Sequence, residues 1–220
     1  MLGRLRRRLR MLLSSKKERR HSLVGPAQLW AAKREFQAGF LAGVGLKPGD
    51  YLLDLGCGTL RGGLPLIAYL DTGHYYGVDV RPEVLNEAQK ELRAAGLGQK
   101  MPTITSVDDL GSTELGLRFD VIWAFSVLIH MDNEVLDGCL DFVKRHLSQT
   151  GRFFANVDTI DREEGSWQGF PVVSRSMSFY EDRAATRNLS VRDVGDLASL
   201  GHVTGRRGDS HRMLEIRPSA

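Results

Sequence analysis

The twelve residues at positions 52–63 read LLDLGCGTLRGG, and no other segment of the chain constrains its fold as strongly. An apolar strand ends in the carboxylate of Asp54, and a turn containing Gly56 and Gly58 follows it. Because glycine has no Cβ, such a turn lets the backbone approach a nucleotide-like ligand closely. The helix expected after the turn points its N-terminal amides at the same ligand, which favours a negative group there. The segment therefore predicts a strand–turn–helix unit that binds a nucleotide-like molecule.

Two kinds of ligand suit a turn of this type, and the residues inside it favour one of them. A dinucleotide site needs the spacing G-x-G-x-x-G, which leaves a bare helix end for the pyrophosphate. Counting from Gly56, Arg61 stands at the third glycine position and Gly62 comes one residue late. Asp54 would also repel a pyrophosphate. A methionyl zwitterion needs a carboxylate and carbonyls for its ammonium and amides for its carboxylate, and this turn supplies both.

The run D-L-G-C-G-T, which starts at Asp54, resembles the first motif of the class I S-adenosylmethionine-dependent methyltransferases. The resemblance implies that S-adenosylmethionine is the cofactor and that the domain is Rossmann-like. It also implies that the cofactor lies against the turn residues Asp54, Gly56, Cys57 and Gly58. The alternative class, an NAD-linked dehydrogenase, is disfavoured by Arg61 and Asp54.

One departure from the family pattern concerns the residues that follow the turn. Many family members have a further glycine where this chain has Leu60, and Arg61 comes next. We expect the helix to start after Thr59 or Leu60, and Arg61 to pair with the methionyl carboxylate or with an anionic substrate. The alternative is a solvated arginine at the first helical position, which the helix dipole disfavours by about 0.3–1 kcal/mol.

A second β-rich run, HYYGVDV at residues 74–80, ends in an acid, Asp79, which follows Asp54 by 25 residues. An acid at the tip of the second strand of a βαβ unit can accept hydrogen bonds from ribose hydroxyls. The resemblance implies this role for Asp79, with Val80 beside the cofactor. The alternative is that Asp79 caps the helix that begins at Pro82.

A short β-branched run, residues 103–107, precedes two further acids, Asp108 and Asp109. The resemblance implies that one of these two carboxylates meets the amino group of the adenine ring. As an alternative, both are loop residues that cap a turn.

The segment FDVIWAFSVLIHM, residues 119–131, reads as a buried strand that runs into a loop and a helix. It resembles the fourth motif of the family, in which Ala124 and Phe125 would line the methionine side of the site. His130 would then face the substrate cleft from the start of the next helix. With an ordinary pKa near 6.5, it is the candidate general base for a hydroxyl acceptor. A histidine that packs or caps the helix is the alternative.

Two segments outside the motifs are expected to contact the acceptor. Residues 26–46 read as a helix, and the resemblance implies that it packs over the cofactor as a lid; alternatively it only covers the sheet. The long segment 158–180 interrupts a strand and its helix, and such loops usually carry substrate contacts. The alternative is an insertion that packs on the sheet edge. The candidate acceptor residues are Trp30, Lys33, Gln37, Trp167, Phe170, Arg175 and Tyr180.

Strands and helices alternate along the chain, which implies an α/β fold with a parallel sheet and right-handed crossovers. Two β-rich runs, 189–194 and 211–217, follow a helix expected over 175–187, and the resemblance implies that the last strand is reversed and inserted between its neighbours. We expect a Rossmann-like seven-stranded mixed sheet, mainly parallel, with helices on both faces, in one domain over residues 23–220. The first five strands are expected at 51–55, 74–79, 103–107, 119–124 and 151–157.

The first twenty residues carry a net charge of +8, against +3 for the whole chain, so the remainder is mildly acidic. Leucines at helical spacing among these arginines predict that residues 1–22 form a basic amphipathic helix or a disordered tail. An amphipathic helix of this kind suits an anionic membrane surface or nucleic acid. No apolar run is long enough to cross a bilayer, and no apolar core of a signal peptide follows the basic start.

The two cysteines, Cys57 and Cys139, give no disulfide framework, and no Cys/His cluster has zinc spacing. We therefore expect no metal site and a cytoplasmic setting, with the tail allowing attachment to the inner face of a membrane.

The combined motifs predict a methyltransferase that uses S-adenosylmethionine and acts on a small-molecule or glycan-like acceptor, at oxygen. The chain lacks a D-P-P-Y or N-P-P-F run of the kind that grips a flipped base, so no specific nucleic-acid substrate is expected. A methyltransferase-like module that binds the cofactor without turnover is the alternative from another class. The identity of the acceptor and the oligomeric state stay open.

Overall fold

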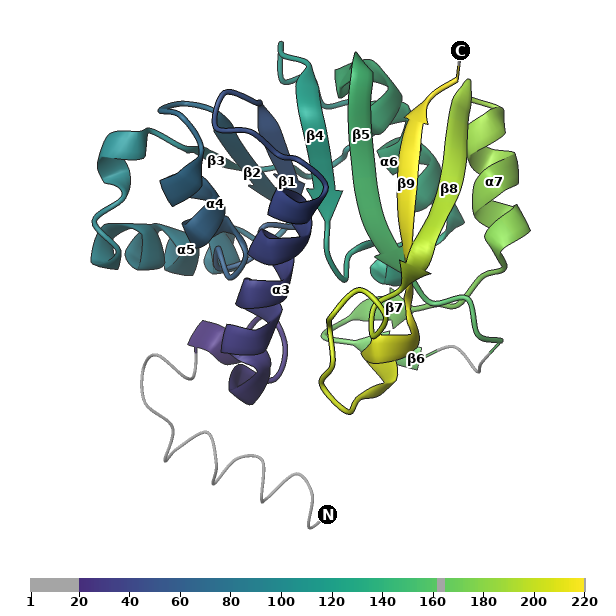
Figure 1. The fold of residues 1–220 in the computed structure, drawn as a ribbon, viewed down its shortest axis with the longest axis horizontal. Coiled ribbons are helices and arrows are strands. Elements are labelled where there is room, and N and C mark those ends of the chain that lie inside the picture. The colour runs from purple at the N-terminus through teal and green to yellow at the C-terminus, as the bar shows by residue number, and fades with distance from the viewer. Residues whose placement is uncertain (1–19, 162–164, 220) are drawn as a thin grey trace.

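The computed structural model describes residues 20–161 and 165–219, which fold around one seven-stranded sheet (Figure 1). The strand order across this sheet is β3-β2-β1-β4-β5-β9-β8. Its strands are β1 (Leu52–Leu55), β2 (Tyr75–Asp79), β3 (Thr103–Ser106), β4 (Phe119–Ala124), β5 (Leu147–Val157), β8 (Leu189–Asp196) and β9 (Arg212–Pro218). Most of the predicted basic tail, residues 1–19, lies outside the described residues.

The strand pairing confirms the predicted mixed sheet. β1 pairs in parallel with β2 and with β4, and β3 and β5 extend the parallel part on either side. β9 is antiparallel to both of its neighbours, β5 and β8, so the last strand is reversed and inserted as expected. β5 starts at Leu147, earlier than the expected residue 151, because Leu147 pairs with Phe119 across a register shift.

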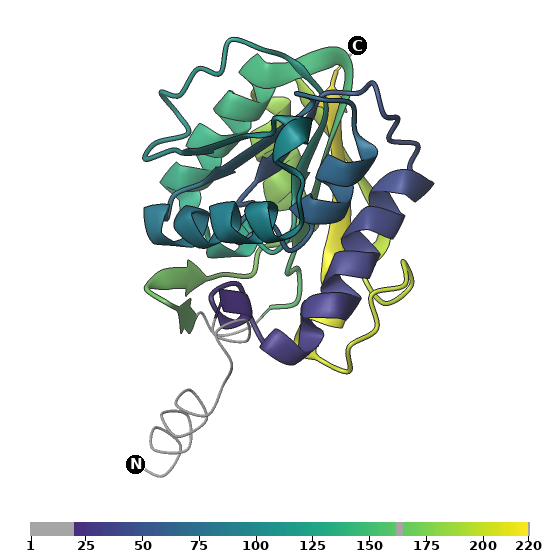
Figure 2. The same cartoon turned by 90° about the vertical axis from the view of Figure 1, so that its left-hand side faces the viewer.

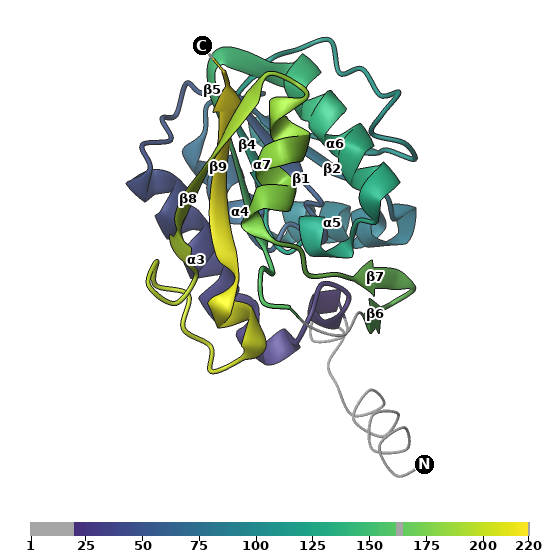
Figure 3. The same ribbon diagram turned by 90° about the vertical axis from the view of Figure 1, so that its right-hand side faces the viewer.

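Helices cover both faces of the sheet (Figure 3). The side chains of β4 divide between the two resulting cores. Because side chains alternate along a strand, Val121 and Trp123 enter the core under the first helices, whereas Ile122 and Ala124 enter the opposite core. The first face carries α3 (Trp30–Gly43), α4 (Gly63–Tyr69) and α5 (Pro82–Ala94), and the second carries α6 (Asn133–His146) and α7 (Met177–Ala185).

The helix after the glycine turn, α4, begins at Gly63 and not after Thr59 or Leu60, so its expected start was wrong. Leu60 has a left-handed backbone, with φ of 61°, and its N–H donates to the Cys57 carbonyl at 3.0 Å. An L-residue in that conformation cannot belong to a right-handed helix. The chain therefore closes an additional tight turn before α4 starts.

The long segment before α7 contains a hairpin that the sequence did not predict. Its strands are β6 (Gly165–Trp167) and β7 (Phe170–Val172), which pair antiparallel. The two residues between them, Gln168 and Gly169, both have positive φ, as a two-residue hairpin turn requires. Strands of three residues are too short to show an alternating pattern, which explains why the segment read as a loop.

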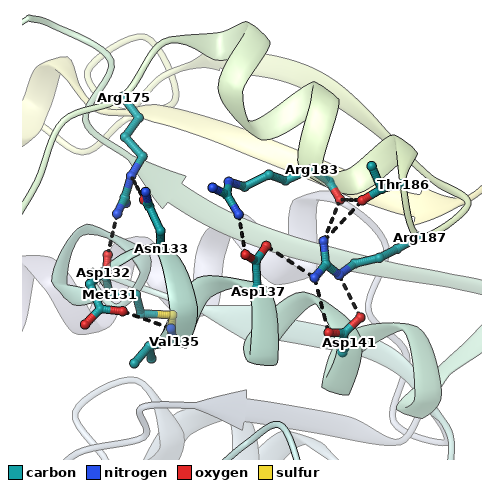
Figure 4. A network of polar contacts seen from close by, with 10 residues as sticks. All are labelled: Met131, Asp132, Asn133, Val135, Asp137, Asp141, Arg175, Arg183, Thr186 and Arg187. Atoms are coloured by element: carbon teal, nitrogen blue, oxygen red, sulfur yellow. Dashed lines mark hydrogen bonds and ion pairs between the residues drawn. The ribbon is translucent and has the colours of Figure 1, made fainter.

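Ion pairs join the two helices of the second face (Figure 4). Arg187 on the α7 side lies 3.2 Å from Asp137 and 2.7 Å from Asp141 of α6, and Arg183 also contacts Asp137. These pairs are partly exposed, so each contributes no more than about 1 kcal/mol of stability.

Three segments from distant parts of the chain gather at the carboxyl ends of the parallel strands (Figures 1 and 2). They are the first turns of α3, the β6–β7 hairpin and the connection between β8 and β9, residues 197–211. Ligands of open α/β sheets bind outside these strand ends. Within the described ranges, no helix is long and apolar enough to cross a membrane.

Candidate functional site

The carboxylate of Asp54 is buried at the end of β1, where only 4% of the residue is exposed. The Tyr75 hydroxyl donates a hydrogen bond to Asp54 Oδ2 at 2.6 Å. Burial raises the pKa of the Asp54 carboxyl to about 7, although the Tyr75 hydroxyl and the charge of Arg61 oppose the shift. Asp54 therefore presents to the turn a carboxyl group whose pKa lies close to neutral pH.

The two glycines of the turn have positive φ and leave no space for a side chain. A Cβ on Gly56 would lie 2.5 Å from Val127 Cγ2, and one on Gly58 would lie 2.6 Å from Val24 Cγ1. The N–H groups of Gly56 and Cys57 both donate to the Val78 carbonyl, at 2.8 and 3.0 Å. The turn is thereby fixed to β2 in a conformation that only glycine adopts without strain.

Cys57 belongs to the turn through its backbone, because its side chain is buried. Only 5% of the residue is exposed, and burial raises the pKa of its thiol well above the usual range. A thiol of this kind is not a nucleophile near neutral pH.

Arg61 is buried beside the turn, with 8% of the residue exposed, so the alternative of a solvated arginine was wrong. Its Nη1 donates to the Val24 carbonyl at 2.7 Å, and its Nε has no hydrogen-bond partner among the described residues. Burial lowers the pKa of Arg61 to about 10, while the charge of Asp54 opposes that shift. A buried cation with an unused donor suits an anionic ligand group.

Asp79 lies at the tip of β2 and is 6% exposed. Its Oδ2 accepts from the Gly58 N–H at 3.1 Å, and its Oδ1 accepts from the Arg81 N–H at 3.0 Å. The helix α5 has Arg81 at its N-cap position and no side-chain cap, so the capping alternative for Asp79 was wrong. The next residue, Val80, is exposed.

The two acids after β3 have different surroundings. Asp109 accepts from the Gly111 N–H at 2.8 Å and from the Ser112 hydroxyl at 2.7 Å, so its carboxylate caps its own turn. Asp108 is also exposed, and a contact of either acid with an adenine stays a prediction. The Val107 N–H donates to the Asp79 carbonyl, which brings the end of β3 beside the end of β2.

Phe125, directly after β4, lies at the centre of an aromatic cluster, and Ala124 before it is fully buried. The Phe125 ring stacks on Trp123 at 5.6 Å between centroids and lies 5.5 Å from Phe36 of α3. A histidine that the sequence did not identify, His202, contacts the same ring at 5.4 Å. The end of β4 and the β8–β9 connection therefore meet at Phe125.

His130 lies in a short 3-10 turn before α6, against the β6–β7 hairpin. Its Nδ1 is 2.8 Å from the Pro171 carbonyl oxygen, and its ring stacks on Trp167 at 5.1 Å. Burial lowers the pKa of His130, the Pro171 carbonyl opposes this, and Arg81 adds to it. His130 therefore contacts both strands of the hairpin and helps to hold it in place. A catalytic role for His130 stays a prediction.

Arg81 joins three parts of the site, although no sequence argument identified it. Its Nη1 donates to the Leu23 carbonyl at 3.2 Å and to Gln168 Oε1 at 3.1 Å. The guanidinium also lies 5.7 Å from the rings of both Trp167 and Phe170. These two aromatic candidates therefore lie near Asp79, on the side of the site that would hold a ribose.

The remaining acceptor candidates make contacts inside the protein. Trp30 stacks on His21 at 3.5 Å between centroids. The side-chain amide of Gln37 binds the Trp123 ring nitrogen and the Lys33 carbonyl. Arg175 donates to Asn133 and to the Met131 carbonyl at the start of α6 (Figure 4), and Tyr180 is buried in the core under α7. The Lys33 ammonium lies 5.8 Å from the centre of the Phe125 ring.

A groove of about 320 Å³ lies between α3 and the β8–β9 connection. Its walls include Phe36 and Phe40 from α3 and Leu200, His202, Val203 and Thr204 from the connection. No cluster of three or more His, Cys, Asp or Glu side chains suited to a metal ion occurs among residues 20–161 and 165–219.

The geometry agrees with comparisons to known proteins. Residues 53–153 match the family model described as a methyltransferase domain, a span that runs from within β1 into β5 and contains both acids Asp54 and Asp79. Over this span the chain is similar to a methyltransferase domain, and its Rossmann-like sheet is the fold of solved S-adenosylmethionine-dependent methyltransferases.

One curated relative is (+)-O-methylkolavelool synthase of Herpetosiphon aurantiacus, 31% identical over 121 residues. The match includes 53% of this chain but only 39% of that protein.

Solved structures share the fold at low identity. Magnesium protoporphyrin IX methyltransferase of Synechocystis, solved with S-adenosylmethionine bound, has a TM-score of 0.67 at 19% identity, covering 97% of this chain and 96% of its own. A glycopeptide N-methyltransferase, in complex with S-adenosylhomocysteine, has a TM-score of 0.66 at 16% identity, covering 83% and 89%. An S-adenosylmethionine-dependent methyltransferase of Clostridium acetobutylicum has a TM-score of 0.65 at 15% identity, covering 87% and 92%.

Proposed function

We propose that this chain transfers the methyl group of S-adenosylmethionine to a hydroxyl oxygen of a small organic acceptor. The observation that carries this proposal is the pairing of two buried acids, Asp54 and Asp79, around a turn in which neither Gly56 nor Gly58 tolerates a Cβ. The cofactor supplies an activated sulfonium methyl, so the protein has to align the acceptor and remove a proton.

The polar side chains around the turn suit the methionyl, ribose and adenine parts of this cofactor. Asp54 and the turn carbonyls suit the ammonium, and the buried Arg61 suits the methionyl carboxylate. Asp79 suits the ribose hydroxyls, and the exposed Asp108 suits the adenine amino group. Arg81 and the hairpin would close over the ribose end, because they already surround Asp79.

The acceptor would enter the groove between α3 and the β8–β9 connection. Phe36 and Phe40 give the groove an aromatic wall, and its volume of about 320 Å³ suits a small molecule. Oxygen is favoured as the reacting atom by the name of the curated relative, which contains an O-methyl group. A glycan-like acceptor remains within the proposal where it presents a hydroxyl group.

Two measurements test this proposal. The purified protein is incubated with S-adenosylmethionine carrying a deuterated methyl group and a panel of alcohols, phenols, sugars and amines, and products are detected by mass spectrometry. We expect labelled O-methyl products and formation of S-adenosylhomocysteine. Binding of the cofactor with no product from any acceptor would instead favour a non-catalytic module, and binding of NAD alone would favour a dehydrogenase.

We also propose that the basic tail attaches the protein reversibly to an anionic membrane surface. The support is the charge of +8 in the first twenty residues of a chain whose remainder is acidic. This attachment would place the enzyme near membrane-linked acceptors without changing the chemistry of the site.

A further inference from the structure

Backbone hydrogen bonds close the β8–β9 connection, residues 197–211, on itself, and a ring contact joins it to α3. The Leu197 N–H donates to the His211 carbonyl and the His202 N–H donates to the Leu197 carbonyl, both at 2.8 Å. The His202 ring also packs edge-on against Phe36 of α3 at 5.0 Å. The connection therefore has a fixed place beside the groove.

His202 is buried, with 4% of the residue exposed, and lies between the Phe36 and Phe125 rings. Its Nδ1 lies 3.2 Å from Asp209 Oδ1, within ion-pair distance but without the geometry of a hydrogen bond. Its Nε2 is buried and has no hydrogen-bond partner in the described part of the chain. A buried polar atom without a partner costs free energy, so a ligand that binds this nitrogen would remove the cost.

Asp209 is itself fixed by the loop that precedes it. The Thr204 hydroxyl donates to Oδ1 at 2.7 Å, and the N–H groups of Thr204 and Gly205 donate to Oδ2 at 2.8 and 2.7 Å. Burial by itself would raise the pKa of Asp209, but these hydrogen bonds outweigh it and keep the pKa below its usual range. A negative carboxylate 3.2 Å from Nδ1 favours the ring proton on that nitrogen, which leaves Nε2 as the basic nitrogen.

Lys33 of α3 supplies a cation to the same cluster. Its Nζ lies 5.8 Å from the centre of the Phe125 ring and makes no hydrogen bond or ion pair among the described residues. Burial lowers the pKa of Lys33 to about 8, Arg61 adds to this, Asp209 opposes it, and Arg206 adds a smaller contribution. A half-buried, unpaired ammonium of this kind attracts an anionic oxygen.

The charged groups that face His202 come from three elements. Burial lowers the pKa of His202, Lys33 on α3 lowers it further, Asp209 on the connection opposes the shift, and Arg61 on the turn has a smaller lowering effect. Since its pKa lies below the ordinary value near 6.5, the imidazole is neutral at pH 7 and able to accept a proton.

The other two histidines near the strand ends use their ring nitrogens within the protein. His130 Nδ1 contacts the Pro171 carbonyl, and its ring stacks on Trp167. His211 Nδ1 lies 3.0 Å from Asn156 Nδ2, and its Nε2 lies 3.7 Å from Asp158. His202 is thus the histidine that combines an orienting carboxylate with a buried, unpaired Nε2.

We propose that His202, oriented by Asp209, takes the proton of the acceptor hydroxyl, and that Lys33 holds the resulting oxyanion. This inference rests on the proposed methyltransferase function and narrows the acceptor to an acidic hydroxyl compound, a phenol or an enol. The O–H bond breaks, its proton binds Nε2, and its electron pair stays on oxygen. The oxygen then forms the bond to the methyl carbon, the methyl–sulfur bond breaks with its pair on sulfur, and the imidazolium releases the proton to water.

The first test measures binding without turnover. The visible absorbance of 4-nitrophenol increases when it ionises, so the phenol is titrated with enzyme saturated with S-adenosylhomocysteine at pH 6. We expect wild-type protein to increase the bound phenolate fraction, and Lys33→Met to weaken phenolate binding at least tenfold. Lys90→Met, an exposed lysine on α5 paired with Glu87, is the matched control and should behave as wild type. Equal binding of phenolate by Lys33→Met and wild type would overturn the role of Lys33.

The second test separates the base from the alignment of substrates. 4-Methylphenol keeps its proton at pH 8, whereas 4-nitrophenol is already ionised, so only the first acceptor needs a base. His202→Gln should lower turnover of 4-methylphenol by about 10²–10⁴-fold and that of 4-nitrophenol by less than tenfold. Cofactor affinity should not change. Asp209→Asn should also lower turnover of 4-methylphenol more than that of 4-nitrophenol, but by a smaller factor. Thermal unfolding of each variant shows whether it folds.

Three results would overturn the inference. Equal losses on both phenols would indicate that His202 only shapes the pocket, and the same selective loss from His130→Gln alone would assign the base to His130. Methylation of alcohols or amines but of neither phenol would reject the acceptor class. In each of these cases cofactor binding persists, whereas failure of the wild-type protein to bind S-adenosylhomocysteine would reject the proposed function itself.

Discussion

At the scale of single residues, Asp79 connects the glycine turn to the covering segments. One carboxylate oxygen accepts from Gly58 and the other from Arg81, so both oxygens already receive donors. Ribose hydroxyls would add two more donors to a carboxylate that is almost fully buried. Replacing Asp79 is therefore expected to change the shape of the turn and the affinity for the cofactor together.

Asp79→Ala should weaken binding of S-adenosylhomocysteine by roughly 1.5–3 kcal/mol, the range for hydrogen bonds to a charged group. Calorimetric titration measures the loss, and Asp71→Ala, at an exposed acid before β2, is the matched control. Unchanged affinity in a folded Asp79→Ala variant would reject the ribose role.

Asp54 predicts a dependence of stability on pH. Its folded pKa of about 7 exceeds the ordinary value of 3.8, so the folded chain retains a proton that the unfolded chain has lost between these two values. The unfolded chain binds fewer protons in that window, and Asp54 therefore lowers the free energy of unfolding as pH rises from about 4 to 7. Asp54→Asn should remove this decline.

Urea denaturation at pH 5 and pH 8 measures the effect. Between pH 5 and pH 8 the free energy of unfolding of wild type should fall by a few kcal/mol more than that of Asp54→Asn, since one pKa unit corresponds to about 1.4 kcal/mol. Asp71→Asn, at an exposed loop acid before β2, provides the comparison. A constant difference between the variant and wild type at both pH values would contradict the raised pKa.

At the scale of elements, the cover of the site consists of two segments that share Arg81. The segment around Leu23 and Val24 contacts Arg81 and Arg61, and the β6–β7 hairpin contacts Arg81 through Gln168. Arg81 is therefore the common contact that relates the position of one segment to that of the other.

Arg81→Met should loosen both covering segments without affecting the sheet. Hydrogen exchange of amides in residues 165–172 should become at least several times faster, and S-adenosylhomocysteine should dissociate faster for the same reason. Arg93→Met, at the last turn of the same helix, should leave both rates unchanged. Equal exchange rates in Arg81→Met and wild type would show that the hairpin is held by other contacts, such as that of His130.

At the scale of the whole molecule, positive charge is concentrated in the first twenty residues, and the remainder is acidic. Each Lys or Arg near an anionic surface contributes about 1 kcal/mol, so such a tail is sufficient for reversible attachment. Arg20 lies 3.0 Å from Glu91 of α5, which makes residue 20 the natural limit for a truncation.

Deleting residues 1–19 should abolish sedimentation with vesicles that contain phosphatidylserine, while methyl transfer to a soluble acceptor is kept. High salt should release the full-length protein, because screening shortens the reach of the charges. Equal sedimentation of the full-length and truncated proteins would exclude the tail as the attachment site.

The sequence was sufficient to place those elements that carry their own motif at the end of a strand, whereas their binding roles stay predictions. The glycine turn, Asp79 and the reversed β9 follow from local patterns and from the resemblance they support. His202 and Asp209 could not be predicted, because they become neighbours of Phe36 and Phe125 only when a connection far along the chain folds back on α3. Arg81 could have been identified from the sequence, because it follows Asp79, the acid at the tip of β2, by two residues.

The central claim, that the glycine turn holds S-adenosylmethionine, is tested most directly by calorimetric titration of S-adenosylhomocysteine into Gly58→Val. A Cβ at Gly58 would lie 2.6 Å from Val24 Cγ1 on a backbone with φ of 57°, so we predict at least a hundredfold loss of affinity in a folded protein. Gly98→Ala, at a glycine with no neighbour within 4 Å, should bind as wild type does. Wild-type affinity in Gly58→Val, or heat with NAD and none with S-adenosylhomocysteine, would contradict the claim.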